Sequence, residues 1–221
     1  MNDLGKKLLL FIIIYLIYQN LFYILLAPEI YSIQIYMLYL ITAYVITLAD
    51  TLIRSLPEER APSKKYSILI LSMILTSPFF LIGAFYENKL LITLFIPIWN
   101  NVIVSYLGFT IYLSGGLFTI IARSQLGRFG TGELIIEKDH QLITNGVYNY
   151  IRNPMYSGGL VATIGFCLVF RSVIILLIMF IYYFLIFRMR IIEEERLLLK
   201  KFGKQFEDYK KRTKRLIPFI Y

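Results

Sequence analysis

The chain has 221 residues, of which 58% are hydrophobic, and a formal net charge of +9 at pH 7. Its mean hydropathy of +0.67 leaves more apolar surface than a soluble domain of this size can bury, which predicts an integral membrane protein. One Cys and one His exclude an internal disulfide and a zinc site of clustered ligands. Basic residues flank the apolar segments, so lipid headgroups are expected as partners and nucleic acid is not.

The N-terminal part of the chain contains four apolar runs long enough to cross about 30 Å of hydrocarbon. The first follows Lys6-Lys7 and has the charge order of a signal peptide. It is too long for the usual apolar region of such a peptide, and no cleavage site follows it, so we expect a retained span. The four runs are Leu8 to Ala27, Tyr31 to Ile53, Tyr66 to Tyr86 and Asn101 to Ala122.

A shorter apolar stretch, Leu90 to Ile98, cannot span a bilayer. Pro97 interrupts it just before Trp99, a residue type that prefers the membrane interface. We expect this stretch at the outer headgroup level.

A further apolar block, Tyr156 to Phe187, contains Arg171-Ser172 near its middle. This interruption predicts a helical hairpin, in which a short helix and a longer one are joined by a tight turn. The polar, glycine-containing segment before it, Ser124 to Asn153, predicts a looped cytoplasmic connection. The tail, Arg188 to Arg215, reads as a helix that is interrupted near Gly203 and lies along the membrane surface or caps the hairpin.

The predicted fold class is therefore all-α, a polytopic integral membrane bundle with about six membrane segments. These include the C-terminal hairpin, and a cytoplasmic loop and a C-terminal surface helix complete the chain. No solenoid repeat or low-complexity linker divides the sequence, so residues 1–221 form a single membrane domain. Residues 1–100 supply spans of unassigned role, and residues 101–221 contain the candidate functional core.

If the segments cross the bilayer alternately, nearly all the positively charged residues fall on one side of the membrane. Of the 23 Lys and Arg residues, only Lys89 and Arg171 fall on one side, which leaves 21 on the other. The positive-inside rule makes the basic side cytoplasmic, so both termini are expected in the cytoplasm. Asp50, four residues before Arg54 at a cytoplasmic helix end, is expected to form an interfacial ion pair.

Arg152-Asn153-Pro154 stands immediately before the hairpin. Pro154 suits the first turn of a helix, and Asn153 is a suitable N-cap, so the helix should begin near Met155. Its free N–H groups, together with Arg152, could hold a carboxylate. The alternative makes Arg152 a headgroup contact and Pro154 only a helix starter.

Glu193-Glu194-Glu195 follows the last apolar run, in a segment dominated by positive charge. Anionic lipid repels carboxylates at the inner membrane surface, which makes this cluster noteworthy. Helical residues point about 100° apart, so at most two of the three can face one pocket. The alternative is a solvated helix face on which Glu193 pairs with Arg196. His140, alone in the loop, is expected to be structural or exposed.

Taken together, the motifs of the C-terminal half resemble those of the superfamily of isoprenylcysteine carboxyl methyltransferases and phospholipid methyltransferases. The resemblance covers roughly Leu107 to Tyr221, and its order and spacing are specific although each piece is weak. The matching residues are Leu126-Gly127, Leu142-x-Thr144-x-Gly146-x-Tyr148-x-x-x-Arg152-x-Pro154-x-Tyr156-x-Gly158, Glu193-Glu194-x-x-Leu197-x-x-x-x-Phe202-Gly203-x-x-Phe206-x-x-Tyr209 and Ile217-Pro218.

The resemblance implies that the loop, the hairpin and the C-terminal helix enclose S-adenosylmethionine, and that a lipid substrate enters from the bilayer. It implies no metal, and the oligomeric state stays open. By similarity, the catalytic residues are Arg152, Asn153 and Glu194. The implied cofactor-binding residues are Gly146, Tyr148, Arg152, Pro154, Tyr156, Glu193 and Glu194.

Asn153 departs from the pattern of the carboxyl methyltransferases, which usually carry His there. Asn-Pro-Met-Tyr looks more like the phosphatidylethanolamine methyltransferases. The expected function is therefore S-adenosylmethionine-dependent methylation of a membrane-embedded lipid or isoprenylated acceptor, either on a carboxylate oxygen or on an amine nitrogen. An amine must lose a proton first, and the base is unassigned among Glu193, Glu194, His140 and the tyrosines.

Two further hypotheses assign a different activity to the chain. The first is an NADPH-dependent reductase of an isoprenoid or sterol double bond, since sterol reductases share a related C-terminal half. They resemble Arg-Asp-Glu where this chain has Ile192-Glu193-Glu194, and a dinucleotide should demand more basic residues than Arg152. The second is a non-enzymatic scaffold or transporter, although a transporter should show charges in mid-span.

Overall fold

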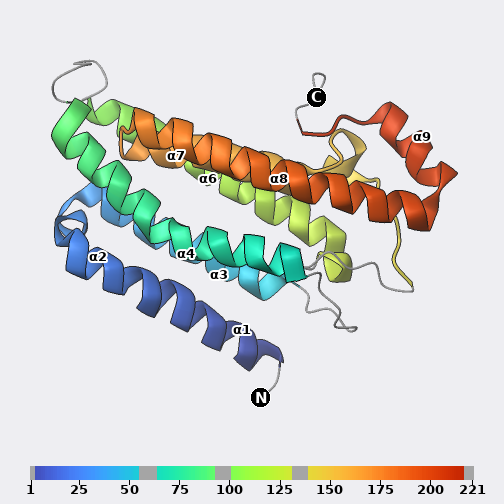
Figure 1. Ribbon diagram of the computed structural model, residues 1–221, viewed down its shortest axis with the longest axis horizontal. Coiled ribbons are helices and arrows are strands. Elements are labelled where there is room, and N and C mark those ends of the chain that lie inside the picture. Colours follow the sequence, from blue (N-terminus) through green and yellow to red (C-terminus); the bar gives the residue numbers. More distant parts are fainter. Residues whose placement is uncertain (1–2, 55–63, 93–100, 131–138, 217–221) are drawn as a thin grey trace.

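The computed structural model describes residues 3–54, 64–92, 101–130 and 139–216, and these residues form a bundle of long helices (Figure 1). The first long helix consists of α1 (Asp3–Phe11), the π-helical segment η1 (Ile12–Gln19) and α2 (Asn20–Leu26). The other long helices are α3 (Gln34–Ile53), α4 (Lys64–Glu87), α6 (Val102–Leu126), α7 (Pro154–Val169) and α8 (Val173–Phe202), followed by the short α9 (Lys204–Arg212). The remaining elements are the π-helical η3 (Asn88–Ile92) and the 3-10 helices η2 (Pro28–Ser32), η5 (Gly127–Phe129) and η6 (Gly146–Asn149).

Four of these helices are long and apolar enough to cross a membrane: Asp3–Leu26, Gln34–Ile53, Val102–Phe129 and Val173–Phe202. The described residues contain no strand, only an isolated parallel bridge between Ile151 and Lys214. The prediction of an all-helical membrane bundle is confirmed. The total of about six membrane segments stays a prediction. Residues 93–100, which include most of the expected interfacial stretch and Trp99, lie outside the described residues, as do Ile217-Pro218.

The hairpin prediction is confirmed by α7 and α8, which are joined by a turn through Arg171 and Ser172. Arg171 adopts a positive φ of 54°, which reverses the chain within three residues. The first turn of α8 has no side-chain cap of its own. Glu87, at the end of α4, supplies one instead: Oε1 accepts from the Val173 and Ile174 amides at 2.7 and 2.8 Å, and Oε2 accepts from Ile175 at 2.9 Å.

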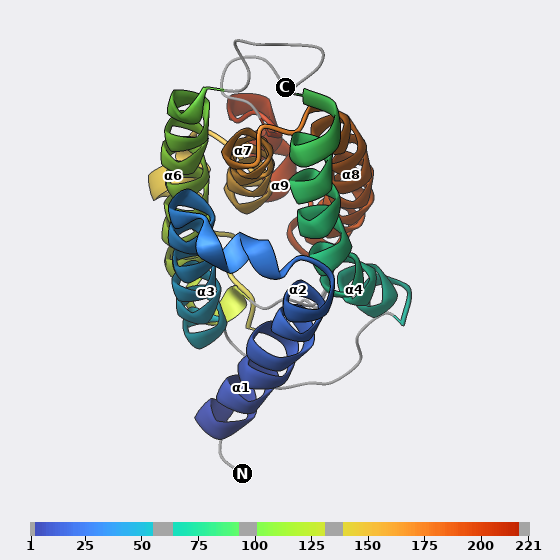
Figure 2. The same ribbon diagram turned by 90° about the vertical axis from the view of Figure 1, so that its left-hand side faces the viewer.

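α7 is the central helix, and Figure 2 shows it between α6 and α8. Glycines allow α6 and α7 to touch through their backbones. A Cβ on Gly108 would lie 2.5 Å from the Val169 amide nitrogen, and one on Gly115 would lie 2.5 Å from that of Ala162. Gly158 and Gly165 meet α6 in the same way from the other side. Small residues therefore allow close packing of these two helices.

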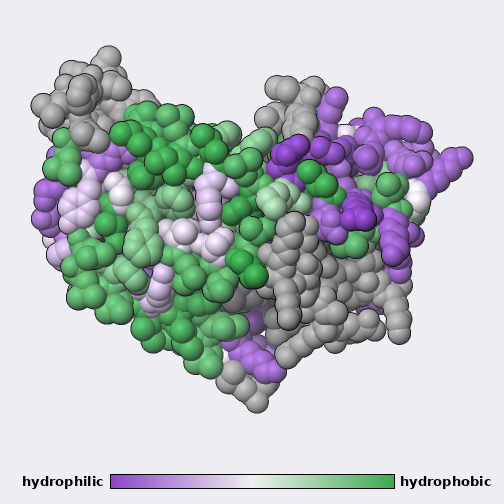
Figure 3. Space-filling view, viewed as in Figure 1, coloured by the Kyte–Doolittle hydropathy of each residue, from purple (hydrophilic) through white to green (hydrophobic). Residues whose placement is uncertain are grey.

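Polar side chains gather at the two ends of the bundle, and apolar ones cover the region between them (Figure 3). At the end that carries α9, Asp50 binds Arg54 Nη2 at 2.7 Å, as expected, and also binds Arg123 of α6. We call this the polar end. At the opposite end Lys89 pairs with Glu29 at 2.6 Å. The two ends match the charge distribution that underlies the predicted topology.

The cytoplasmic orientation of the polar end can be tested by labelling single cysteines in intact cells. On a Cys167→Ser background, Glu29→Cys should react with a membrane-impermeant maleimide, because residue 29 lies at the end that is poor in positive charge. Glu207→Cys, on α9, should react only after permeabilisation. The reverse pattern would contradict the assigned orientation.

The Glu87 cap predicts a large and local contribution to stability. Glu87→Ala should lower the free energy of unfolding by about 2 kcal/mol, because three amide groups at the start of α8 lose their acceptor in a poorly hydrated region. Unfolding of the detergent-solubilised protein by SDS titration measures this. The control Glu29→Ala removes an exposed ion pair at the same end and should cost less than about 1 kcal/mol. Equal losses would show that the carboxylate does not support the turn.

Candidate active site

A cavity of about 880 Å³, partly open to solvent, lies at the polar end. We call it the polar-end cavity. Its walls come from the loop before the hairpin, the first turn of α7, the end of α8 and α9. The lining residues are Leu126, Phe129, His140, Gln141, Leu142, Ile143, Tyr148, Arg152, Asn153, Met155, Tyr156, Glu194, Glu195, Leu197, Leu198, Phe206 and Tyr209.

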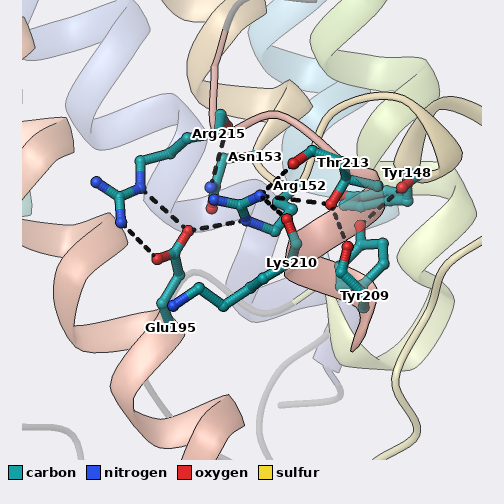
Figure 4. A network of polar contacts seen from close by, with 8 residues as sticks. All are labelled: Tyr148, Arg152, Asn153, Glu195, Tyr209, Lys210, Thr213 and Arg215. Atoms are coloured by element: carbon teal, nitrogen blue, oxygen red, sulfur yellow. Dashed lines mark hydrogen bonds and ion pairs between the residues drawn. The ribbon is translucent and has the colours of Figure 1, made fainter. Parts of the chain in front are cut away.

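Arg152 lies in the wall of this cavity and is bound on several sides by the protein itself (Figure 4). Its Nε donates to Glu195 Oε1 at 3.1 Å, and its Nη1 donates to the carbonyl of Lys210 at 3.1 Å and to that of Thr213. Arg215 binds the same carboxylate, with Nη2 2.8 Å from Oε2. Hydrogen bonds of Arg152 thus connect the end of α9 and the segment after it to the start of the hairpin.

Asn153 is the N-cap residue of α7, as predicted, and Pro154 occupies the first helical position. The prediction that the Asn153 side chain caps the helix is wrong, since that side chain makes no cap hydrogen bond. Its Nδ2 instead donates to the carbonyl of Arg215 at 3.1 Å. The segment around Arg215 thus competes with the helix's own N–H groups for the Asn153 side chain. The sequence near residue 153 does not reveal this distant partner.

Tyr156, Glu194 and Arg190 form a second polar cluster. The Tyr156 hydroxyl donates to Glu194 Oε1 and accepts from Arg190 Nε at 3.0 Å. Arg190 Nη2 also lies 3.5 Å from Glu194 Oε1. The cluster thus holds the Glu194 carboxylate in a fixed position at the cavity wall.

The three glutamates separate according to the helical period. Glu194 and Glu195 line the polar-end cavity, whereas Glu193 lies outside it, 3.8 Å from Arg196. The sequence analysis did not predict Glu195 as a site residue. Its spacing of four residues from the apolar Ile191 could have indicated it, because this spacing puts both residues on the face of α8 that is buried in the bundle.

Gly146 and Tyr148 position the loop before the hairpin, although Gly146 does not line the cavity. Gly146 has a φ of 57°, and a Cβ there would collide with the Gln125 side chain. Tyr148 lines the cavity; its hydroxyl donates to the Ala122 carbonyl at 3.2 Å, and its own carbonyl accepts from Tyr209 at 2.7 Å. Burial raises the pKa of Tyr148 and Tyr209, so both hydroxyls stay protonated and act as donors.

His140 is part of the cavity wall and not an isolated loop residue. Its ring lies 4.5 Å from that of Phe129, centroid to centroid. Burial, together with the charge of Lys201, lowers the pKa of His140 below its usual value, so the imidazole is neutral at pH 7. The ring therefore offers a flat, uncharged surface to a ligand.

A second cavity, of about 1,120 Å³, lies among the helices next to the first. We call it the intramembrane cavity. It shares Met155, Tyr156 and Glu194 with the polar-end cavity, so these three residues form the wall between the two. Its lining also includes three arginines, Arg54, Arg123 and Arg190.

Comparisons with known proteins find methyltransferases. A family model described as phospholipid methyltransferase matches residues 103–205, which cover nearly all of α6 and the whole of α7 and α8. The chain is 31% identical over 119 residues to a probable protein-S-isoprenylcysteine O-methyltransferase of Oryza sativa subsp. indica, covering 53% of this chain and 62% of that protein. It is 35% identical over 83 residues to the protein-S-isoprenylcysteine O-methyltransferase of Dictyostelium discoideum, covering 38% of this chain and 35% of that protein.

The matched part thus spans less than two thirds of the length of these relatives. A solved structure extends the similarity to the whole fold. The eukaryotic intramembrane Ras methyltransferase, an isoprenylcysteine carboxyl methyltransferase, aligns with a TM-score of 0.61 and 25% identity, covering 98% of this chain and 74% of that one. In sequence over its C-terminal half and in fold over nearly its whole length, the chain is therefore similar to the integral membrane methyltransferases, which include the isoprenylcysteine carboxyl methyltransferases and the phospholipid methyltransferases.

Proposed function

We propose that this protein transfers a methyl group from S-adenosylmethionine to the carboxylate of an amphiphile embedded in the bilayer. The observation that carries the proposal is the shared wall. One cavity opens at the polar end, where a water-soluble donor can enter, and the other lies among the helices, where a lipid-soluble acceptor can enter. Among the described residues, Met155, Tyr156 and Glu194 alone belong to both linings, so donor and acceptor would meet there.

The polar-end cavity fits the donor in chemistry. The rings of Phe129, His140 and Tyr148 provide surfaces for an adenine, and Glu194 provides a carboxylate for an ammonium or ribose hydroxyls. When bound, S-adenosylmethionine supplies a methyl group that its sulfonium already makes electrophilic.

The protein's own contribution is then to position groups and exclude water. Tyr156 and Arg190 hold the Glu194 carboxylate in place. Arg152 and Arg215 neutralise Glu195 and hold the C-terminal segment against the cavity. No covalent nucleophile is needed, and the buried Cys167 lines neither of these two cavities.

The charge of the intramembrane cavity favours an anionic acceptor. Among the described residues, three arginines and one glutamate line it, and Asp50 pairs with two of these arginines, so a formal charge of 3 − 1 − 1 = +1 remains. A carboxylate is already ionised at neutral pH and needs no base, whereas an ammonium group would meet like charge and would have to lose a proton. Asn153 and the match to the phospholipid methyltransferase model support an amine acceptor instead, and a direct comparison of the two acceptors distinguishes them.

Neither a reductase nor a scaffold gains support from these findings. The matching family model, the two curated relatives and the solved structure are all methyltransferases. A scaffold would have no use for two cavities that meet at a buried tyrosine and a carboxylate.

Glu194 is expected to be the main acidic contact of the donor. Glu194→Gln should weaken binding of S-adenosylmethionine by about 1.5 to 3 kcal/mol, because it removes one charge-assisted hydrogen bond. Calorimetric titration in detergent measures this, and Glu207→Gln on α9 is the surface control. Glu193→Gln should have a smaller effect, since that carboxylate pairs with Arg196. Unchanged affinity in Glu194→Gln would refute its role.

The choice of acceptor can be measured by radiolabelled methyl transfer to N-acetyl-S-farnesylcysteine and to phosphatidylethanolamine. We expect the carboxylate to be methylated in preference. Arg54→Gln should lower kcat/KM for the carboxylate about tenfold or more, because it leaves Asp50 paired with Arg123 alone and so removes the net positive charge at the intramembrane cavity. Arg128→Gln, which breaks an exposed pair with Asp139, should leave it unchanged. Preference for the amine would overturn the carboxylate assignment.

A further inference from the structure

A third cavity, of about 850 Å³, lies at the centre of the bundle. We call it the central cavity. Every long helix of the bundle contributes to its lining. It adjoins the intramembrane cavity, because both are lined by Tyr15, Gln19, Ser77, Gly159 and Tyr183. An acceptor whose reactive end lies in the intramembrane cavity therefore has room for its remaining part in the central cavity.

The lining of the central cavity is unexpectedly polar for its depth. Hydroxyl groups are costly in a bilayer interior unless they find hydrogen-bond partners. A site for a pure hydrocarbon chain would be better served by Leu, Ile or Phe at the same positions. The tyrosines that line it are Tyr15, Tyr23, Tyr39, Tyr44, Tyr112 and Tyr183.

One of these hydroxyls is buried and incompletely paired among the described residues. The Tyr44 hydroxyl lies beside the Asn20 side chain but makes no hydrogen bond of good geometry to it or to another described residue. Tyrosines outside the cavity behave differently: Tyr18 donates to the Leu75 carbonyl at 2.9 Å, and Tyr86 donates to that of Leu26 at 2.6 Å. The central cavity thus contains a tyrosine hydroxyl that a ligand oxygen could satisfy.

The helix that supplies Tyr15 and Gln19 is also unusual. Both residues lie in η1, whose π-helical turns are wider than those of an α-helix and are frequent at functional sites. Gln19 is buried, and its Nε2 donates to Ser77 Oγ at 2.8 Å across the cavity wall.

We propose that the central cavity binds the membrane-embedded part of the acceptor, and that this part carries hydroxyl or carbonyl oxygens. The inference rests on the proposed function, since it assigns the rest of the molecule whose carboxylate is methylated. A site built to pair with an oxygen discriminates strongly against an analogue that lacks it, because the site's own polar groups are then left unpaired.

The test compares two probes that differ by one hydroxyl group. They are N-acetyl-S-farnesylcysteine and the same compound with a hydroxyl at the end of its farnesyl chain. Their dissociation constants are measured by displacement of the tritiated first compound from detergent-solubilised protein, without S-adenosylmethionine. We expect the hydroxylated compound to bind at least about tenfold more tightly to the wild type.

Matched variants locate the effect. In Tyr44→Phe with Tyr183→Phe the ratio of the two dissociation constants should fall to near one, and in the control pair Tyr18→Phe with Tyr86→Phe it should be unchanged. Melting temperatures identify any variant that does not fold, and the single variants then replace the double one. Equal affinity of the wild type for the two probes, as a water-filled cavity would give, overturns the inference. The inference is also overturned if the cavity variants leave the ratio of the two dissociation constants unchanged.

The binding assay also separates this inference from the proposed function. A preserved binding preference without methyl transfer to either probe would refute the methyltransferase proposal alone. Methyl transfer to both probes with equal affinity would refute only the assignment of the central cavity.

Discussion

α6 and α7 touch through their backbones, and the location of the site depends on this contact. Four glycines, Gly108 and Gly115 on α6 with Gly158 and Gly165 on α7, allow the two backbones to approach without a side chain between them at these positions. Lipid offers no hydrophobic driving force between helices, so such close packing is what holds them together. Because α7 begins at Pro154, the rigid pair also sets the depth at which Tyr156 meets Glu194.

The polar end adds charge to this packing. Glu195 is bound by Arg152 and Arg215, and Asp50 is bound by Arg123 of another helix as well as by the neighbouring Arg54. Buried or half-buried ion pairs thus join segments that are far apart in sequence. Removal of one partner from such a pair typically costs about 3 to 5 kcal/mol, because the remaining charge stays buried. The charges at the polar end thus hold the cavity walls in place as well as facing a ligand.

Local sequence sufficed for features that depend on local chemistry. The apolar runs, the break at Arg171-Ser172 and the helix start at Pro154 follow from composition and backbone preference, and the structure agrees. Local sequence did not suffice where the partner of a side chain comes from a distant segment of the chain. The Asn153 side chain binds the Arg215 carbonyl and not its own helix, Glu87 caps a helix in another part of the chain, and His140 packs beside Phe129 in the cavity wall. The three cavities could not be predicted either, because their linings combine residues from most helices of the bundle.

The return of the chain from α9 to the start of the hairpin has a consequence for biosynthesis. Arg152 emerges from the ribosome before α7 and α8, whereas its partners at Lys210 and Thr213 emerge after them. The backbone bridge of Ile151 likewise forms only after Lys214 has been synthesised. Since translation is directional, the hairpin must enter the membrane with one wall of the polar-end cavity missing. A chain truncated before residue 210 would therefore contain the whole hairpin and still lack the closed cavity.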